Sequence, residues 1–101
     1  MADIEISNVE ILTGNERKIV DKLLKDYEFK IQRLTKTPIK LKVDIKEYDK
    51  DGKNKKYSIN SQVIFSGKIF VSSAWDWDLT RAIRKAMIKI ENEAEHQWKK
   101  R

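Results

Sequence analysis

The sequence predicts one α+β domain in which two helices pack on one face of a four-stranded sheet, with the element order β-α-β-β-β-α. Two stretches carry apolar residues at helical spacing, and the region between them alternates apolar with polar residues. The chain is 101 residues long, which is enough for one hydrophobic core and too short for two. We therefore treat residues 1–101 as a single domain.

The N-terminal third predicts a strand followed by a helix. Ile4 and Ile6 alternate with polar residues up to Asn8, which breaks the alternation before an extended approach through Val9 and Ile11. The stretch Thr13-Gly14-Asn15-Glu16 is a capping box and predicts a helix start. This helix must end before Pro38, and its apolar face consists of Val20, Leu23, Leu24, Tyr27, Ile31 and Leu34.

The middle of the chain predicts three consecutive strands that form an antiparallel meander. In the first of them Ile39, Leu41, Val43 and Ile45 alternate with Lys40, Lys42, Asp44 and Lys46. Residues 49–54 are polar and predict a loop, after which Tyr57, Ile59, Val63 and Phe65 mark the next strand. A turn at Ser66-Gly67 leads into the last strand, Lys68-Ile69-Phe70-Val71.

The final segment predicts a second helix that starts in Asp76-Trp77-Asp78, where either Asp can cap it. Trp75 and Trp77 flank this start, and we expect one of them to close the end of the core, the alternative being stacking on bases. The apolar stripe of the helix is Leu79, Ile83, Ala86, Met87, Ile90, Ala94 and Trp98.

The composition favours a polyanionic partner. Lys and Arg number 22 against 16 acidic residues, which gives a net charge of +6. The longest apolar runs are far shorter than the roughly 20 residues that span a bilayer, and the first residues lack the features of a signal peptide. We therefore expect a cytosolic protein without a membrane partner. The absence of Cys excludes disulfides, thiolate catalysis and most structural zinc sites.

Projection of both helices at about 100° per residue separates the charges by sign. Asp21, Asp26 and Glu28 fall on the flanks of the first helix, whereas the poles opposite the core are basic. A mixed-charge solvated surface is the simpler interpretation for any one Lys, but two poles of the same sign, one containing an aromatic residue, favour contact with RNA. The candidate RNA-binding residues are Lys18, Lys22, Lys25, Phe29, Arg33, Arg81, Arg84, Lys85 and Lys89.

No motif in the sequence indicates catalysis, a metal or a cofactor. The stretch Asp49-Lys50-Asp51-Gly52 resembles the start of a calcium loop, but Lys53 and Asn60 stand where that loop needs ligands. Helix capping accounts for Asp76 and Asp78, and the single His96 has no partner motif. We therefore expect no enzyme activity, no small-molecule substrate, no metal and no cofactor.

The element order and two short segments resemble the ribosome hibernation-promoting factor and ribosome-associated inhibitor family in its short, single-domain form. Asp78-Leu79-Thr80-Arg81-Ala82-Ile83, followed by Lys89-Ile90-Glu91, is similar to the last-helix pattern of that family, although Thr80 stands where an aromatic residue is usual. The preceding Ile69-Phe70-Val71-Ser72-Ser73 also fits. Lys89 is the one basic candidate that this match itself includes.

The resemblance implies a fold similar to the double-stranded RNA-binding domain and a site on the small ribosomal subunit, in the channel for messenger and transfer RNA. A protein bound there would repress translation or preserve idle ribosomes, and we expect it to be a monomer. Two alternatives remain open. One is a general double-stranded RNA-binding module, and the other is a small protein–protein interaction domain that uses the polar sheet face or an edge strand.

Overall fold

The chain folds in the predicted element order. A computed structural model describes residues 3–8, 10, 12–50 and 54–99, so Val9 and Ile11 of the predicted approach to the first helix lie outside the described residues. The elements are β1 (Asp3–Ser7), α1 (Gly14–Thr35), β2 (Lys40–Lys50), β3 (Asn54–Phe65), β4 (Lys68–Asp76) and α2 (Leu79–Lys99). The predicted α+β class and the order β-α-β-β-β-α are confirmed.

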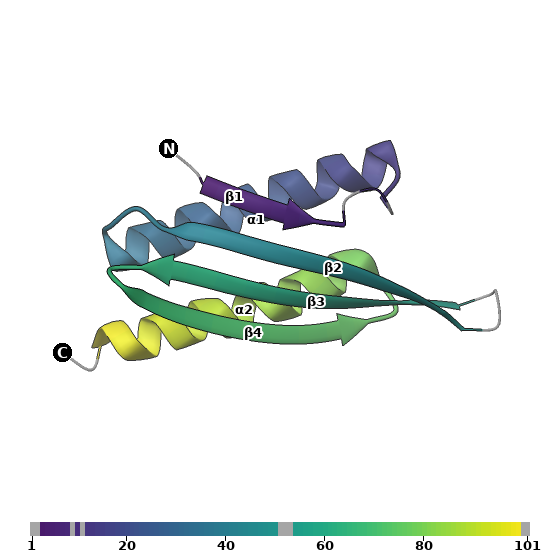
Figure 1. The fold of residues 1–101 in the computed structure, drawn as a ribbon. Coiled ribbons are helices and arrows are strands. Elements are labelled where there is room, and N and C mark those ends of the chain that lie inside the picture. Colours follow the sequence, from purple (N-terminus) through teal and green to yellow (C-terminus); the bar gives the residue numbers. More distant parts are fainter. Residues whose placement is uncertain (1–2, 9, 11, 51–53, 100–101) are drawn as a thin grey trace.

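The four strands form one sheet in the order β1-β2-β3-β4. β1 runs parallel to β2, while β2, β3 and β4 form the predicted antiparallel meander. A parallel pair needs a crossover connection, and α1 provides it between β1 and β2. Both helices lie behind the same face of the sheet (Figure 1), α1 behind β1 and β2 and α2 behind β3 and β4. β4 and β1 are the two edge strands.

The core lies between the sheet and the helices, where the two periodic patterns meet. Leu41, Val43 and Ile45 of β2 and Ile59 of β3 point to this side and are at most 1% exposed. The helices contribute their apolar stripes, whose fully buried members are Val20, Leu24, Ile31, Ile83, Ala86, Met87, Ile90 and Ala94. Period-2 strands and period-3.6 helices thus bury their apolar faces together, which is the main stabilising term of the fold.

The start and the end of α1 follow from local hydrogen bonds. The backbone N–H of Glu16 donates to Thr13 Oγ1 over 3.1 Å, and the Glu16 carboxylate accepts from the backbone N–H of Thr13 at 2.9 Å. The predicted capping box is therefore confirmed. At the other end Lys36 adopts the left-handed conformation and its N–H closes the last turn on the carbonyl of Gln32.

The hairpin between β2 and β3 is longer than predicted. β2 continues to Lys50 and β3 begins at Asn54, and these two residues pair, so the ends of the predicted 49–54 loop belong to the hairpin. The rest of that loop, residues 51–53, lies outside the described residues. Strand pairing extends into polar sequence here because the ladder hydrogen bonds do not depend on side-chain polarity.

β4 extends to Asp76, beyond the predicted Val71, and α2 begins only at Leu79. Asp78 is the residue that caps α2, because its carboxylate accepts from the backbone N–H of Arg81 at 2.9 Å. The buried Asp76 accepts instead from the backbone N–H of Asp78 at 3.0 Å. The side chain of Trp98, predicted on the apolar stripe, lies outside the described residues. Among the helices that the structure describes, none is long and apolar enough to cross a membrane.

Candidate nucleic-acid interface

The outer surface of α1 carries a row of exposed cations and one exposed aromatic ring. Residues three or four positions apart lie on one helix face, so cationic side chains at this spacing form a continuous row along the helix. Phe29 is 55% exposed, and the guanidinium carbon of Arg33 lies 5.8 Å from its ring centroid. We call this row the α1 ridge; its members are Lys18, Lys22, Lys25, Phe29 and Arg33, all exposed as predicted.

The cations of the α1 ridge are not neutralised within the described part of the molecule. None of Lys18, Lys22 and Lys25 forms an ion pair with another described residue. Asp21, an acidic side chain on the same helix, pairs with Arg17 across one turn, with 3.1 Å between Nε and Oδ1. The α1 ridge therefore keeps a net positive charge that faces solvent.

Glu28 does not lie beside the α1 ridge in the way that helix projection suggested. Its side chain was predicted on a flank of the helix, but the residue is only 6% exposed. Its Oε2 atom is buried and has no hydrogen-bond partner among the described residues. Since α1 packs against α2, a flank position on this helix need not face solvent, and Glu28 contributes no exposed counter-charge to the α1 ridge.

The four cations predicted on α2 divide into two pairs. Arg81 and Arg84 are exposed, and neither guanidinium takes part in an ion pair with a described residue. Lys85 and Lys89 are also exposed, but their ammonium groups turn toward the edge of β4. Lys85 Nζ lies 2.7 Å from Asp76 Oδ2 and 3.4 Å from the carbonyl of Trp75, while Lys89 Nζ lies 2.8 Å from the carbonyl of Ser73.

This arrangement affects the charge of Lys85 more than that of Lys89. The hydrogen bond from Lys85, and after it the backbone N–H of Asp78, hold the pKa of Asp76 below its ordinary value of 3.8. Asp76 is thus a charged partner for Lys85 at neutral pH. Lys89 is bonded to a neutral carbonyl, so its positive charge stays available to an external anion.

Trp75 and Trp77 lie at the edge between the sheet face and α2. The sequence predicts that one of them closes the core, but they are 49% and 50% exposed. Their ring centroids are 5.8 Å apart at an interplanar angle of 87°, and Lys56 Nζ lies 4.3 Å from the centroid of Trp75. Strand parity is the signal that could have placed Trp75 outward, because it shares a face of β4 with the exposed Ile69 and Val71.

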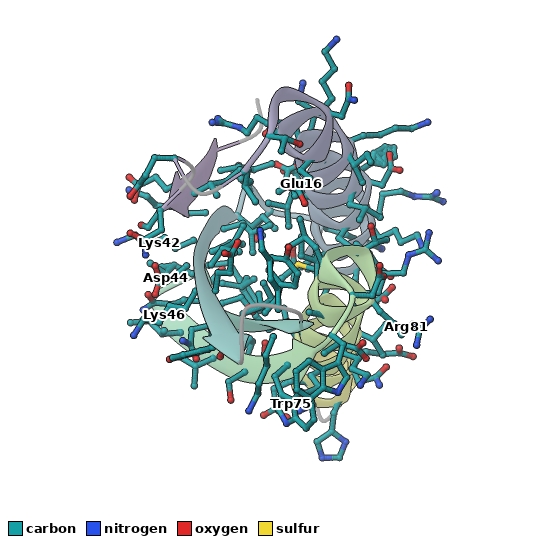
Figure 2. All side chains as sticks on the ribbon, turned by 90° about the vertical axis from the view of Figure 1, so that its right-hand side faces the viewer. Glu16, Lys42, Asp44, Lys46, Trp75 and Arg81 are labelled. Carbon is teal, nitrogen blue, oxygen red and sulfur yellow. The ribbon has the colours of Figure 1, made fainter. Side chains whose placement is uncertain are left out.

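Figure 2 shows how these groups are distributed around the domain. Arg81 points away from the helix layer, whereas Lys42, Asp44 and Lys46 point away from the opposite face of the sheet, and Trp75 lies between the two sides (Figure 2). In the part of the chain that the structure describes, no group of three or more acidic or His side chains could hold a metal ion. Cationic side chains thus lie on both the helix side and the sheet side of the described residues (Figure 2).

Comparison with known proteins relates the fold to two solved structures. No family model matches the sequence, and a search of curated proteins finds no match. The Thermus thermophilus Protein Y N-terminal domain is 22% identical with a TM-score of 0.67, over 95% of this chain and 98% of that chain. A ribosomal subunit interface protein from Coxiella burnetii is 17% identical with a TM-score of 0.57, over 99% of this chain and 98% of that chain. These structures share the fold along its whole length.

Proposed function

We propose that this protein is a non-catalytic RNA-binding protein of the ribosome hibernation factor type, and that its partner is ribosomal RNA of the small subunit. Two lines of argument support the proposal. The segments around Asp78–Ile83 and Lys89–Glu91 resemble the last helix of that family. The fold is shared along its whole length with a protein named for the ribosomal subunit interface.

The observation that carries the proposal is the set of exposed cations on both helices that form no ion pair with another described residue. Lys22 and Lys25 on α1 and Arg81 and Arg84 on α2 lack ion-pair partners within the described residues. Exposed cations on neighbouring helices suit the phosphates of a folded RNA, since phosphate contacts supply affinity and fix orientation. Recognition would then depend on shape and charge, as is usual for structured RNA.

The finer proposal is that the protein binds in the channel between the head and the body of the small subunit. A domain bound there would overlap the paths of messenger and transfer RNA, and would repress translation or preserve idle ribosomes. It would act in the cytosol, as a monomer and without a cofactor. In this proposal Phe29 adds a stacking contact within the α1 ridge, because its ring is exposed between cations.

Sucrose-gradient cosedimentation with purified small subunits at low and moderate salt tests this function. We expect comigration that weakens steeply as salt rises, because counterions compete for the same phosphates. A plain RNA duplex is added in excess as a competitor. Retention on the subunit despite the duplex supports the ribosomal partner, whereas complete displacement supports a general double-stranded RNA-binding module. Absence from the subunit fractions at both salts would contradict ribosome binding.

A further inference from the structure

A cleft beside Trp75 lies apart from the α1 ridge, at the edge where β3 and β4 meet α2. Its volume is about 460 Å³, within the range of roughly 300–1,000 Å³ that is usual for ligand sites. Three elements supply its walls, so the cleft depends on the tertiary fold and not on one flexible segment. The residues that matter for its chemistry are Ser58, Asn60, Ser73, Trp75, Lys85 and Lys89.

The indole of Trp75 is exposed yet held in place. Trp77 packs edge-on against it, and the ammonium of Lys56 lies over the ring, 4.3 Å from the centroid. Such contacts fix an aromatic plane without burying it, which lowers the entropic cost of a stacking partner. The residue as a whole is 49% exposed. This is the geometry of a stacking platform.

The cleft also presents polar side chains that are available to a ligand. The side chains of Ser58, Asn60 and Ser73 form no hydrogen bond with other described residues. An Asn amide can donate and accept at once, as the edge of a nucleobase requires. Ser58 lies directly opposite Trp75 in the β3–β4 register and Asn60 opposite Ser73, so these groups line the strands next to the indole.

Cations stand at the rim of the same cleft. Lys89 lines the cleft and is bonded to the neutral carbonyl of Ser73, whereas Lys56 lies next to the cleft, over the indole. Neither forms an ion pair with another described residue, so both keep charge for an anion. Lys85 is different because Asp76 already neutralises it. The combination of an aromatic platform, free amide and hydroxyl groups and flanking ammonium groups matches a base, its edge and the adjoining phosphates.

We propose that this cleft binds one nucleotide of single-stranded RNA, with its base stacked on Trp75, its edge facing Asn60 and its phosphates near Lys56 and Lys89. This inference rests on the proposed RNA-binding function and adds a second kind of contact to it. The bases of a duplex are stacked on each other and are not free to reach an indole, so the ligand is an unpaired nucleotide. The helix cations would hold structured RNA while Trp75 captures an unpaired base beside it.

Fluorescence anisotropy with a labelled oligouridine about ten nucleotides long tests the site. We expect Trp75→Ala to lower the affinity about 5- to 150-fold, the range expected for one stacked base, and Trp75→Phe to retain most of it. Val71→Ala is the matched control, since it truncates another exposed apolar side chain on the same face of β4. Circular dichroism checks that each variant is folded. Affinity for a plain RNA duplex is expected to be unchanged in all three variants.

Three results with oligouridine or a base-free chain, and a fourth with a free nucleotide, would overturn the site. The first three are equal affinities of Trp75→Ala and Val71→Ala for oligouridine, an equal affinity of the wild-type protein for a base-free ribose phosphate chain, and the absence of oligouridine binding by the wild-type protein. Full competition by uridine monophosphate at the same nucleotide concentration would assign the cleft to a free nucleotide and equally overturn it. Each can occur while the protein still cosediments with small subunits, and then the proposed function stands without the cleft. Loss of cosedimentation with intact Trp75-dependent binding would instead remove the ribosomal partner and leave the cleft.

Discussion

Lys85 Nζ lies 2.7 Å from Asp76 Oδ2, and this ion pair joins the first turns of α2 to the last residue of β4. The same ammonium contacts the carbonyl of Trp75 at 3.4 Å. Asp76 is 8% exposed, whereas the Lys85 side chain is half exposed. Lys85 therefore has a structural role in addition to any role in RNA binding, and reversal of its charge would perturb both.

Removal of the Lys85 ammonium should make stability less dependent on acid. The pKa of Asp76 is lowered in the folded protein. The charged carboxylate therefore stabilises the fold fully above the unfolded pKa of about 3.8, and this stabilisation is lost as pH falls through the folded pKa. Lys85→Met should thus be less stable than the wild-type protein near neutral pH, and this difference should shrink in acid. Urea unfolding across that pH range measures it.

Lys89→Met is the matched control for this prediction, because Lys89 contacts a carbonyl that does not titrate. The difference in free energy of unfolding between Lys89→Met and the wild-type protein should not depend on the ionisation of Asp76. The free energies of unfolding of Lys85→Met and the wild-type protein could also differ by the same amount down to strongly acidic pH. That result would show that the ion pair does not stabilise the fold.

Truncation of Leu24 tests the placement of the core. Leu24 is fully buried between α1 and the sheet, so Leu24→Ala should lower the free energy of unfolding by about 2–5 kcal/mol. Ile88 is 46% exposed on α2, and Ile88→Ala should change it by no more than about 0.5 kcal/mol. Chemical denaturation measures both variants. Similar losses from the two truncations would contradict the described orientation of the helices.

The capping box gives a local test. Thr13→Ala removes the acceptor for the Glu16 N–H and should cost about 0.5–2 kcal/mol of stability. Asn15→Ala, an exposed change in the same turn that removes no described hydrogen bond, serves as the comparison. Thermal unfolding of the two variants should show the lower midpoint for Thr13→Ala, and equal midpoints would mean that the cap contributes nothing.

Much of this fold follows from the sequence because its patterns are local. The capping box at Thr13 and the 3.6-residue spacing place α1, and the strict alternation from Ile39 to Lys46 places β2. The ends of the strands do not follow in the same way. The Lys50–Asn54 pair forms because the partner strand is adjacent, and that information is not contained in either residue.

In the candidate interface, too, the sequence predicts some features and not others. Helix periodicity alone correctly placed Lys18, Lys22 and Lys25 at the surface. The contacts of Lys85 and Lys89 join α2 to residues 10 and 16 positions earlier, and the burial of Glu28 depends on the surroundings of its helix. The cleft beside Trp75 likewise requires the register that sets Ser58 opposite it. Such features depend on how elements pack, which periodicity does not specify.

The most direct test of RNA binding by the helix cations compares two double charge reversals in subunit cosedimentation over a range of salt. Lys22→Glu with Arg84→Glu changes one cation on each helix that forms no ion pair with another described residue, and Lys42→Glu with Lys46→Glu makes the same charge change on the outer face of the sheet (Figure 2). We predict that the helix variant binds more weakly. The negative slope of log affinity against log salt should become shallower by about 2, one for each lost phosphate contact. The sheet variant should keep the wild-type slope. Equal losses of affinity in the two variants would contradict RNA binding by the helix cations, because net charge alone would then explain the binding.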